Sequence, residues 1–175
     1  FFLIFFDIHH SCGNYILNVC YLYQMDIIFS EIKNEMDLNK SFELRKEVFV
    51  IEQGCPIEEE FDEFDDLNRI GKDSLHFNVY KNDICISTAR VLIDINSAKI
   101  QRVCVLKDYR GSGIGLFIML KLHKYLIQKN IIKTTLSSQD HAIGFYKKLG
   151  YSEIGNSYLE AGIIHKKMYI NFNSS

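Results

Sequence analysis

The residue types best suited to chemistry gather in one short stretch of this chain. An apolar run, Val103-Cys104-Val105, precedes the segment Arg110-Gly111-Ser112-Gly113-Ile114-Gly115. Three alternate glycines leave no Cβ over the turn, so backbone N–H groups can approach a ligand closely. The first N–H groups of a following helix have no intrahelical acceptor, and the helix dipole adds partial positive charge there. The stretch therefore predicts a site for a phosphate or pyrophosphate group.

Two common phosphate-binding loops do not fit this stretch. A P-loop needs Lys followed by Ser or Thr after its last glycine, and Gly115 is followed by Leu116. The dinucleotide fingerprint needs Gly or Ala where Leu116 stands, and an acidic residue about 20 positions further on that is also absent. On the loop alone, a glycine-rich turn without a ligand remains the alternative.

The elements that must position this loop follow from hydrophobic spacing and turn residues. Strands are predicted at Ile27–Ile32, Leu75–Tyr80, Ile84–Ile93, Lys99–Leu106, Ile132–Ser137, Tyr151–Ile154 and Ile163–Ile170. Helices are predicted from Asp37 as cap to about Ile51, from Ile114 to Asn130, and from Asp140 as cap to Gly150. Hairpins are expected at Asn82-Asp83 and near Asn96-Ser97.

This order of elements predicts an α/β fold. A connection through a helix, between the strands that hold Val105 and Leu136, implies a parallel, right-handed crossover. The hairpins at Asn82-Asp83 and near Asn96-Ser97 imply antiparallel neighbours. We expect a central mixed sheet with helices on both faces.

Composition narrows the class of protein. The chain has 175 residues, of which 47% are hydrophobic and 24% charged, and its net charge is −2. These values suit a globular protein and give no reason to expect nucleic acid or a membrane as partner. Five cysteines without a C-x-x-C pair favour reduced thiols and a cytoplasmic location.

The first 24 residues differ from the rest. Phe1 to Phe6 is apolar, but Asp7, His9 and His10 interrupt the run far short of a membrane span. We expect residues 1–24 to be a poorly ordered extension and residues 25–171 to form a single domain. His9, His10 and Cys12 lack a second ligand pair at zinc spacing, so no metal is expected.

Four blocks of the sequence resemble one family. Arg110-x-x-Gly113-x-Gly115 after Val-x-Val resembles the acetyl-CoA loop of GNAT-superfamily N-acetyltransferases. Ser138 to Tyr151 is similar to the family's Ala-x-x-Phe-Tyr-x-Lys-Leu-Gly-Phe/Tyr segment. Residues 44–56 and 159–168 resemble the ElaA-like branch, in which Pro is usual where Ile164 stands. The resemblance covers roughly residues 26–170.

The resemblance implies the GNAT-like fold, with splayed parallel strands, and a function. It implies transfer of the acetyl group of acetyl-CoA directly to a primary amine of a small molecule, by a monomer or homodimer. The pantetheine arm would lie along the backbone of Val103, Cys104 and Val105 and contact Gln139, although Gln139 could equally cap a helix. The pyrophosphate would bind the N–H groups of Arg110, Gly111, Ser112, Gly113, Ile114 and Gly115.

The resemblance also assigns candidate catalytic residues. Tyr146 matches the family tyrosine that faces the coenzyme sulfur and would protonate the departing thiolate; a core aromatic is the alternative. Glu52, Glu160 and His165 border the expected acceptor cleft, and none of them is singled out as the base. The Cys104 thiol is a poor nucleophile candidate because a mid-strand thiol is usually buried.

Two questions about function stay open at this point. A GNAT-like domain could bind acyl-CoA without turnover, or its acceptor could be an amine of a protein. The run Glu58 to Asp66, with seven acidic residues in nine, reads first as a solvated loop. The alternative is a functional role, in which the negative charge of the run favours a cationic amine at the entrance for the acceptor.

Overall fold

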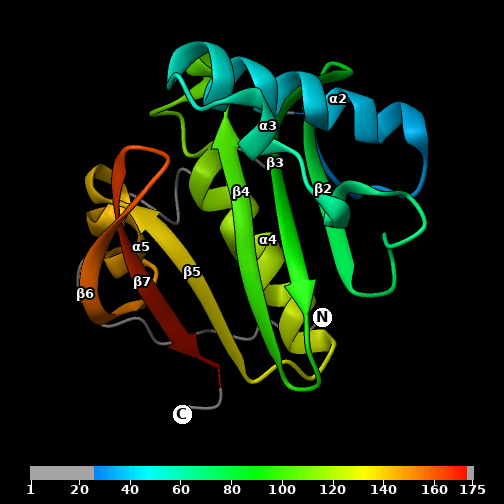
Figure 1. The fold of residues 1–175 in the computed structure, drawn as a ribbon. Helices are drawn as coiled ribbons and strands as arrows, with labels where there is room; N and C mark the ends of the chain where they lie inside the picture. The colour runs from blue at the N-terminus through cyan, green and yellow to red at the C-terminus, as the bar shows by residue number, and fades with distance from the viewer. Residues whose placement is uncertain (1–25, 173–175) are drawn as a thin grey trace.

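The computed structural model describes residues 26–172, and the expectation for residues 1–24 falls outside this range. Its centre is a seven-stranded sheet with the order β1-β2-β3-β4-β5-β7-β6 (Figure 1). All strand pairs are antiparallel except β4 with β5, the predicted parallel crossover. The strands are β1 (Ile27–Glu31), β2 (Ser74–Lys81), β3 (Ile84–Ile93), β4 (Ser97–Val105), β5 (Lys133–Gln139), β6 (Ser152–Glu160) and β7 (Ile163–Asn171).

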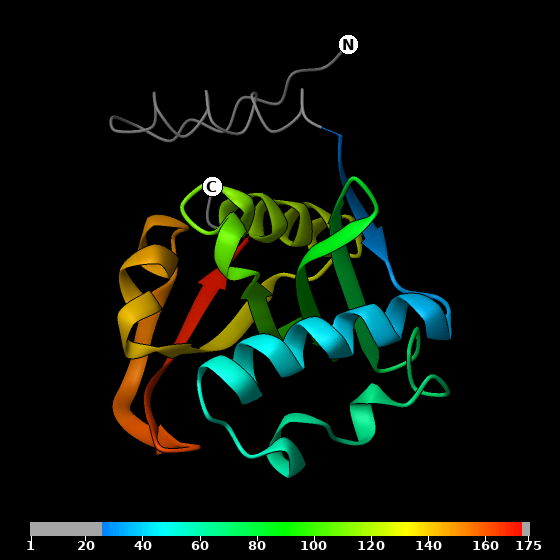
Figure 2. The ribbon, with the colours of Figure 1, turned by 90° about the horizontal axis from the view of Figure 1, so that it is seen from above.

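Helices cover both faces of the sheet, as the sequence predicts. Figure 2 shows α4 on one face and α2 on the other, with the sheet between them. The α-helices are α2 (Glu35–Arg45), α3 (Ile57–Glu60), α4 (Ile114–Gln128) and α5 (Ile143–Lys148). A π-helix, η1 (Lys46–Glu52), continues α2, and short 3-10 turns are η2 (Glu63–Asp65), η3 (Lys107–Tyr109) and η4 (Asp140–Ala142).

The main core lies between the sheet and α4. The predicted apolar face of this helix is buried, with its side chains packed against Phe77, Ile100 and Leu136 of the strands. That face comprises Ile114, Phe117, Ile118, Leu122 and Leu126. The packing fixes where α4 begins and hence where the glycine-rich loop lies.

The predicted helix caps are wrong at both positions. Asn34, not Asp37, caps α2: its side chain accepts a hydrogen bond of 2.9 Å from the Asp37 N–H. Asp37 lies inside the first turn, where its carboxylate accepts from Tyr80 and Lys40. Asp140 begins a 3-10 turn, and α5 then starts at Ile143 without a side-chain cap.

The predicted helix through Ile51 is continuous, but its second half is wider than an α-helix. The Gln53 N–H donates to the Val48 carbonyl, five residues back, at 3.2 Å. A π-helix of this kind is rare and often found at functional sites. Here it sets the direction in which Glu52 and Gln53 point.

The acidic run is solvated in part only: Glu58, Glu59, Asp62, Glu63 and Asp66 are exposed, as the sequence predicts, but two of its carboxylates are buried. Glu60 and Asp65 are 3% and 8% exposed. Arg45 donates to both carboxylates, with Nε–Oε1 and Nη1–Oδ1 distances of 2.6 Å. Arginines from β3 and β4 complete the cluster: Arg90 pairs with Asp62 and Asp65, and Arg102 with Glu60.

This buried ion-pair cluster ties residues 54–66 down over β3 and β4. Burial alone would raise the pKa of Asp65, but hydrogen bonds and charge from Arg45, with the charge of Arg90, hold it below the usual value. For Glu60 burial outweighs its arginine partners, so its pKa is raised. Three carboxylates of the run, on Glu60, Asp62 and Asp65, are therefore balanced by arginines and contribute little field outside the cluster.

Two buried histidines should make the folded protein less stable as the pH falls. Burial lowers the pKa of His76 and of His123 to about 4. The unfolded chain protonates these side chains near pH 6.5, whereas the folded chain does not until about pH 4. Each should therefore reduce the free energy of unfolding by roughly 1–2 kcal/mol between about pH 7.5 and pH 5.

Urea unfolding at these two pH values measures the effect. His123→Gln should remove about half of the pH-dependent loss, while His141→Gln, at an exposed position, should leave it in place. An unchanged loss in His123→Gln would show that this side chain is not the source.

Candidate active site

The parallel strands β4 and β5 separate along their length, as the resemblance implies. They pair only over Ser97–Ile100 and Lys133–Leu136. In Figure 1 they lie together at one end and diverge toward their C-terminal ends. Beyond Ile100, β4 therefore presents an unpaired edge toward β5. A bulge accompanies the separation, since the register with β3 shifts between Thr88 and Arg90 and Arg102 has φ +53°.

The glycine-rich loop lies at the open end of these strands and presents unpaired donors. Within the described residues, the N–H groups of residues 111–115 have no hydrogen-bond acceptor; the first intrahelical bond recorded runs from Phe117 N to Gly113 O, 2.9 Å. Gly111 and Gly113 have φ of +75° and +91°, which favour glycine. Consecutive free N–H groups at the N-terminus of a 15-residue helix suit an anion such as a pyrophosphate.

The three strand residues predicted to contact a coenzyme do not all face the open edge. The Cys104 carbonyl accepts a hydrogen bond of 2.7 Å from the Ser87 hydroxyl, so the Cys104 backbone faces β3. Backbone groups alternate in direction along a strand, so those of Val103 and Val105 face β5. The Val105 carbonyl already accepts from Arg110 Nε at 2.9 Å. Val103 therefore offers the backbone groups best placed for a ligand at this edge.

The end of η1 bridges the two separated strands. Arg110, in the loop after β4, forms a bidentate ion pair with Glu52 at 2.6 and 2.8 Å. Gln139, at the end of β5, donates to Gln53 Oε1 at 2.8 Å. The sequence analysis assigns no role to Gln53. The only feature of the sequence that could have pointed to it is its position next to Glu52.

These contacts change the interpretation of Glu52 and Gln139. The hydrogen bonds and charge of Arg110 lower the pKa of Glu52, which makes this carboxylate a weaker base. Glu52 is better described as a residue that holds the glycine-rich loop in position. Gln139 occupies the N-cap position of η4, but its side chain makes no capping hydrogen bond and instead ties β5 to η1.

Tyr146 of α5 lies in the core beside the separated strands. Its side chain is 9% exposed and its ring packs edge-on against Phe145 and Tyr151. Burial, with a smaller effect of the nearby Cys104 thiol, raises the pKa of Tyr146 to about 12. No described residue hydrogen-bonds the Tyr146 hydroxyl, and its oxygen is not among the fully buried unpartnered atoms, so a ligand can reach it. The hydroxyl is thus protonated and free to donate to a ligand.

The other two candidate acceptor residues lie on the β6–β7 hairpin. His165 pairs with Gln139 in the sheet register, and its Nδ1 lies 2.9 Å from the Ile163 carbonyl. A carbonyl only accepts, so Nδ1 donates its hydrogen there, and in the neutral ring the lone pair is on Nε2. Glu160 is exposed beside the Ala161–Gly162 turn and is not brought to the other site residues. Ile164, which departs from the resemblance to the ElaA-like branch, lies beyond this turn inside β7.

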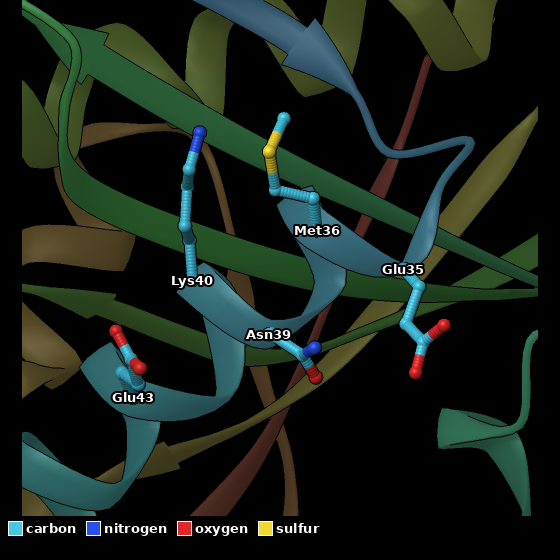
Figure 3. A pocket seen from close by; sticks show the side chains of 5 residues that line it. All are labelled: Glu35, Met36, Asn39, Lys40 and Glu43. Carbon is cyan, nitrogen blue, oxygen red and sulfur yellow. The ribbon is translucent and has the colours of Figure 1, made fainter.

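Two hollows in the described part of the chain differ in how well they suit an acceptor. The larger, about 460 Å³, lies on the outer side of α2, and Figure 3 shows that a single helix supplies all its side chains. Polar groups from different elements do not converge there, as they do in most ligand sites. The smaller, about 210 Å³, lies where β4 and β5 begin to separate and is formed by Lys99, Thr135, Leu136, Ser137, Tyr158 and Lys167.

Other kinds of site are weaker in the described part of the chain. Burial raises the pKa of the Cys104 thiol well above its usual value, which suits the expectation that it is not a nucleophile. Residues 26–172 contain no group of three or more His, Cys, Asp or Glu side chains placed to hold a metal ion. Within the same range, every helix is too short or too polar to span a bilayer.

Comparison with known proteins decides the family. Residues 48–172 match the acetyltransferase (GNAT) domain. The chain belongs to the GNAT acetyltransferase family. A Bacillus subtilis (strain 168) protein that bears an acetyltransferase name is 42% identical over 138 residues, which are 79% of this chain and 92% of that protein. Protein ElaA of Escherichia coli (strain K12) is 33% identical over 127 residues, 70% of this chain and 80% of ElaA.

Solved structures place this GNAT chain in the same group. The crystal structure of Escherichia coli ElaA matches with a TM-score of 0.73 and 28% identity, over 82% of this chain and 98% of that one. An acyl-CoA N-acyltransferase from Pseudomonas aeruginosa matches with a TM-score of 0.74 and 25% identity, over 82% and 99%. The ElaA-like branch and the GNAT fold are thus both confirmed, and the chain is an acyltransferase by family.

Proposed function

We propose that this GNAT protein transfers the acetyl group of acetyl-CoA directly to a primary amine of a small molecule. The observation that carries the proposal is the row of unpaired N–H groups at residues 111–115, in line with the unpaired edge of β4. The loop fits a pyrophosphate, and the Val103 backbone fits the amide groups of a pantetheine arm. When bound, the coenzyme supplies the activated acetyl group.

The chain's own residues then have distinct roles. Tyr146 holds a proton for the departing thiolate. We assign His165 Nε2 as the acceptor for a proton of the amine, because the other ring nitrogen already donates to the Ile163 carbonyl. Glu52, through Arg110, and Gln53, through Gln139, hold the ends of β4 and β5 against η1.

The structure also bears on the two alternatives. A protein acceptor needs a broad open face, whereas the hollow at the separating strands, formed by residues of β4, β5, β6 and β7, has a volume of only about 210 Å³. This favours a small acceptor. A binding module without turnover has no need of a proton donor at Tyr146. The cytoplasmic location and the monomeric or dimeric state remain predictions.

Gly115 offers a test of the coenzyme loop that does not depend on strain. Gly113 has φ +91°, so a side chain there could impair folding by itself. Gly115 lies in the first turn of α4, and an added Cβ would meet only Phe145 and Val105 side chains, at 3.6 Å or more. A carboxylate in the first helical turn is favourable for the helix.

Gly115→Asp should therefore fold well yet weaken coenzyme A binding by roughly 10- to 100-fold, because its charge repels the pyrophosphate. Gly115→Asn, of the same size and without charge, is the matched control and should lose much less. Titration calorimetry with coenzyme A, together with thermal melting, measures both properties. Equal affinity in the two variants would show that the pyrophosphate does not lie at this loop.

A further inference from the structure

The small hollow of about 210 Å³ contains two lysines without anionic partners. Lys99 of β4 and Lys167 of β7 form no ion pair with any described residue. The neighbouring Lys166 differs, because it lies 3.5 Å from Glu153 and donates to the Gly155 carbonyl. Successive residues of a strand point to opposite faces, so the ion pair of Lys166 leaves Lys167 unaffected.

Hydroxyl groups accompany the two lysines. Ser137 and Thr135 of β5 lie between β4 and β7 in the sheet, on the same hollow. The Tyr158 hydroxyl donates to Ser137 Oγ at 2.6 Å, which fixes the position of that oxygen. Ammonium groups combined with hydroxyl donors are the groups that proteins use to bind carboxylate or phosphate.

Nearby carboxylates do not neutralise the hollow. Glu52 is occupied by Arg110, and the carboxylates of Glu60, Asp62 and Asp65 are occupied by arginines. The negative field expected from the acidic run is therefore reduced, and its remaining carboxylates, on Glu58, Glu59, Glu63 and Asp66, do not line the hollow. The charged residues that line the hollow, Lys99 and Lys167, are both positive.

The hollow is separate from the loop that would bind a pyrophosphate. Lys99 pairs with Thr135 where β4 and β5 are still hydrogen-bonded, whereas the loop follows the far end of β4. Lys99 precedes Val103 by four residues, roughly 13 Å along a strand. The lysine side chain covers part of that distance, and a short carbon chain or a sugar ring would cover the rest.

We infer that the acceptor is a small primary amine that also carries an anionic group, a carboxylate or a phosphate, which binds Lys99 and Lys167. This inference rests on the proposed function and names its substrate class. It reverses the expectation, drawn from the acidic run, that the acceptor is simply cationic.

Matched acceptor pairs test the inference with the full chain and acetyl-CoA. One pair compares an amino acid with its carboxamide, and another compares a phosphorylated aminosugar with the free aminosugar. Thiol release gives kcat/KM for each acceptor. The anionic member of at least one pair should be preferred by roughly 10- to 100-fold, and the better pair distinguishes carboxylate from phosphate.

Lys99→Gln and Lys167→Gln should bring this preference close to one, chiefly through KM of the anionic acceptor. Lys124→Gln, an exposed lysine on α4 across the sheet, is the control and should keep the preference. Because the preference is a ratio within one preparation, partial misfolding of a variant does not change it. Equal use of charged and neutral acceptors by the unmodified protein would overturn the inference and leave the proposed function intact.

If no acceptor is acetylated, a binding measurement still tests whether Lys99 and Lys167 bind an anion. Inorganic phosphate and acetate are added separately to the protein saturated with coenzyme A, and backbone amide signals are followed by NMR. Saturable shifts at residues 99, 135 and 167, absent in Lys99→Gln, would support the anion site even if the proposed function failed. No saturable shift with either anion would overturn it.

Discussion

Tyr146→Phe is expected to lower kcat by roughly 10²- to 10⁴-fold, the range typical of a positioned general acid. The ring and its contacts with Phe145 and Tyr151 stay, so the packing of α5 is retained. The Kd of coenzyme A should change little, because the proposed coenzyme contacts are backbone groups of the loop and β4. Steady-state kinetics and calorimetry on the same preparation separate the two effects.

The raised pKa of Tyr146 is compatible with this role. Burial disfavours the tyrosinate, so the proton is held throughout the neutral range. The same lack of water disfavours a thiolate at the same place, which raises its proton affinity as well. Proton transfer from Tyr146 to the thiolate is therefore less unfavourable than the difference between their pKa values in water indicates.

Tyr151→Phe is the matched control. Its hydroxyl lies 2.9 Å from His123 Nε2 and 3.0 Å from Thr134 Oγ1, inside the core. Loss of these bonds should reduce stability by about 1 kcal/mol each and leave kcat per folded molecule nearly unchanged. If Tyr146→Phe behaves like Tyr151→Phe, Tyr146 is a packing residue and has no part in the reaction.

Arg45→Met is expected to destabilise the fold by about 3–5 kcal/mol, the range for removing one partner of a buried ion pair. Arg45 bonds the carboxylates of Glu60 and Asp65 and also the Glu60 carbonyl, at 2.7 Å. Without it two carboxylates stay buried, with only Arg90 and Arg102 to balance them. Such a loss is a large share of the stability of an ordinary domain.

Chemical denaturation measures the loss, and limited proteolysis shows whether residues 54–66 detach first. Arg69→Met removes a surface ion pair, since Arg69 and Asp73 are both partly exposed, and should change stability little. A similarly small effect of Arg45→Met would mean that the cluster does not anchor the loop.

Much of this fold could be predicted from the sequence because the patterns that indicate its helices, strands and turns are local. The spacing of Ile114, Phe117, Leu122 and Leu126 marks one helical face, and Asn82-Asp83 has the positive φ values, +49° and +64°, of a tight hairpin turn. The parallel pairing of β4 with β5 follows from the helix between them. These features need only a few consecutive residues to be recognised.

The errors come from partners that are distant in the sequence. Glu60 and Asp65 look solvated beside five other acidic residues, because Arg45, Arg90 and Arg102 stand 15 to 42 residues from Glu60. Glu52 resembled a free base for the same reason, since Arg110 follows it by 58 residues. Asp37 is as good a cap by type as Asn34, and only the backbone geometry chooses between them.

The π-helix makes one segment unusually sensitive to length. Its bond from Gln53 N to Val48 O encloses one residue more than an α-helical turn. A further residue inserted between 46 and 52 would exceed what the widened turn takes up and would rotate everything after it by about 100°. Glu52 and Gln53 would then turn away from Arg110 and Gln139. Loss of one residue, in contrast, would let the segment return to ordinary α-helical winding with little rotation. Over evolution this stretch should therefore tolerate replacement or loss of a residue more readily than a further insertion.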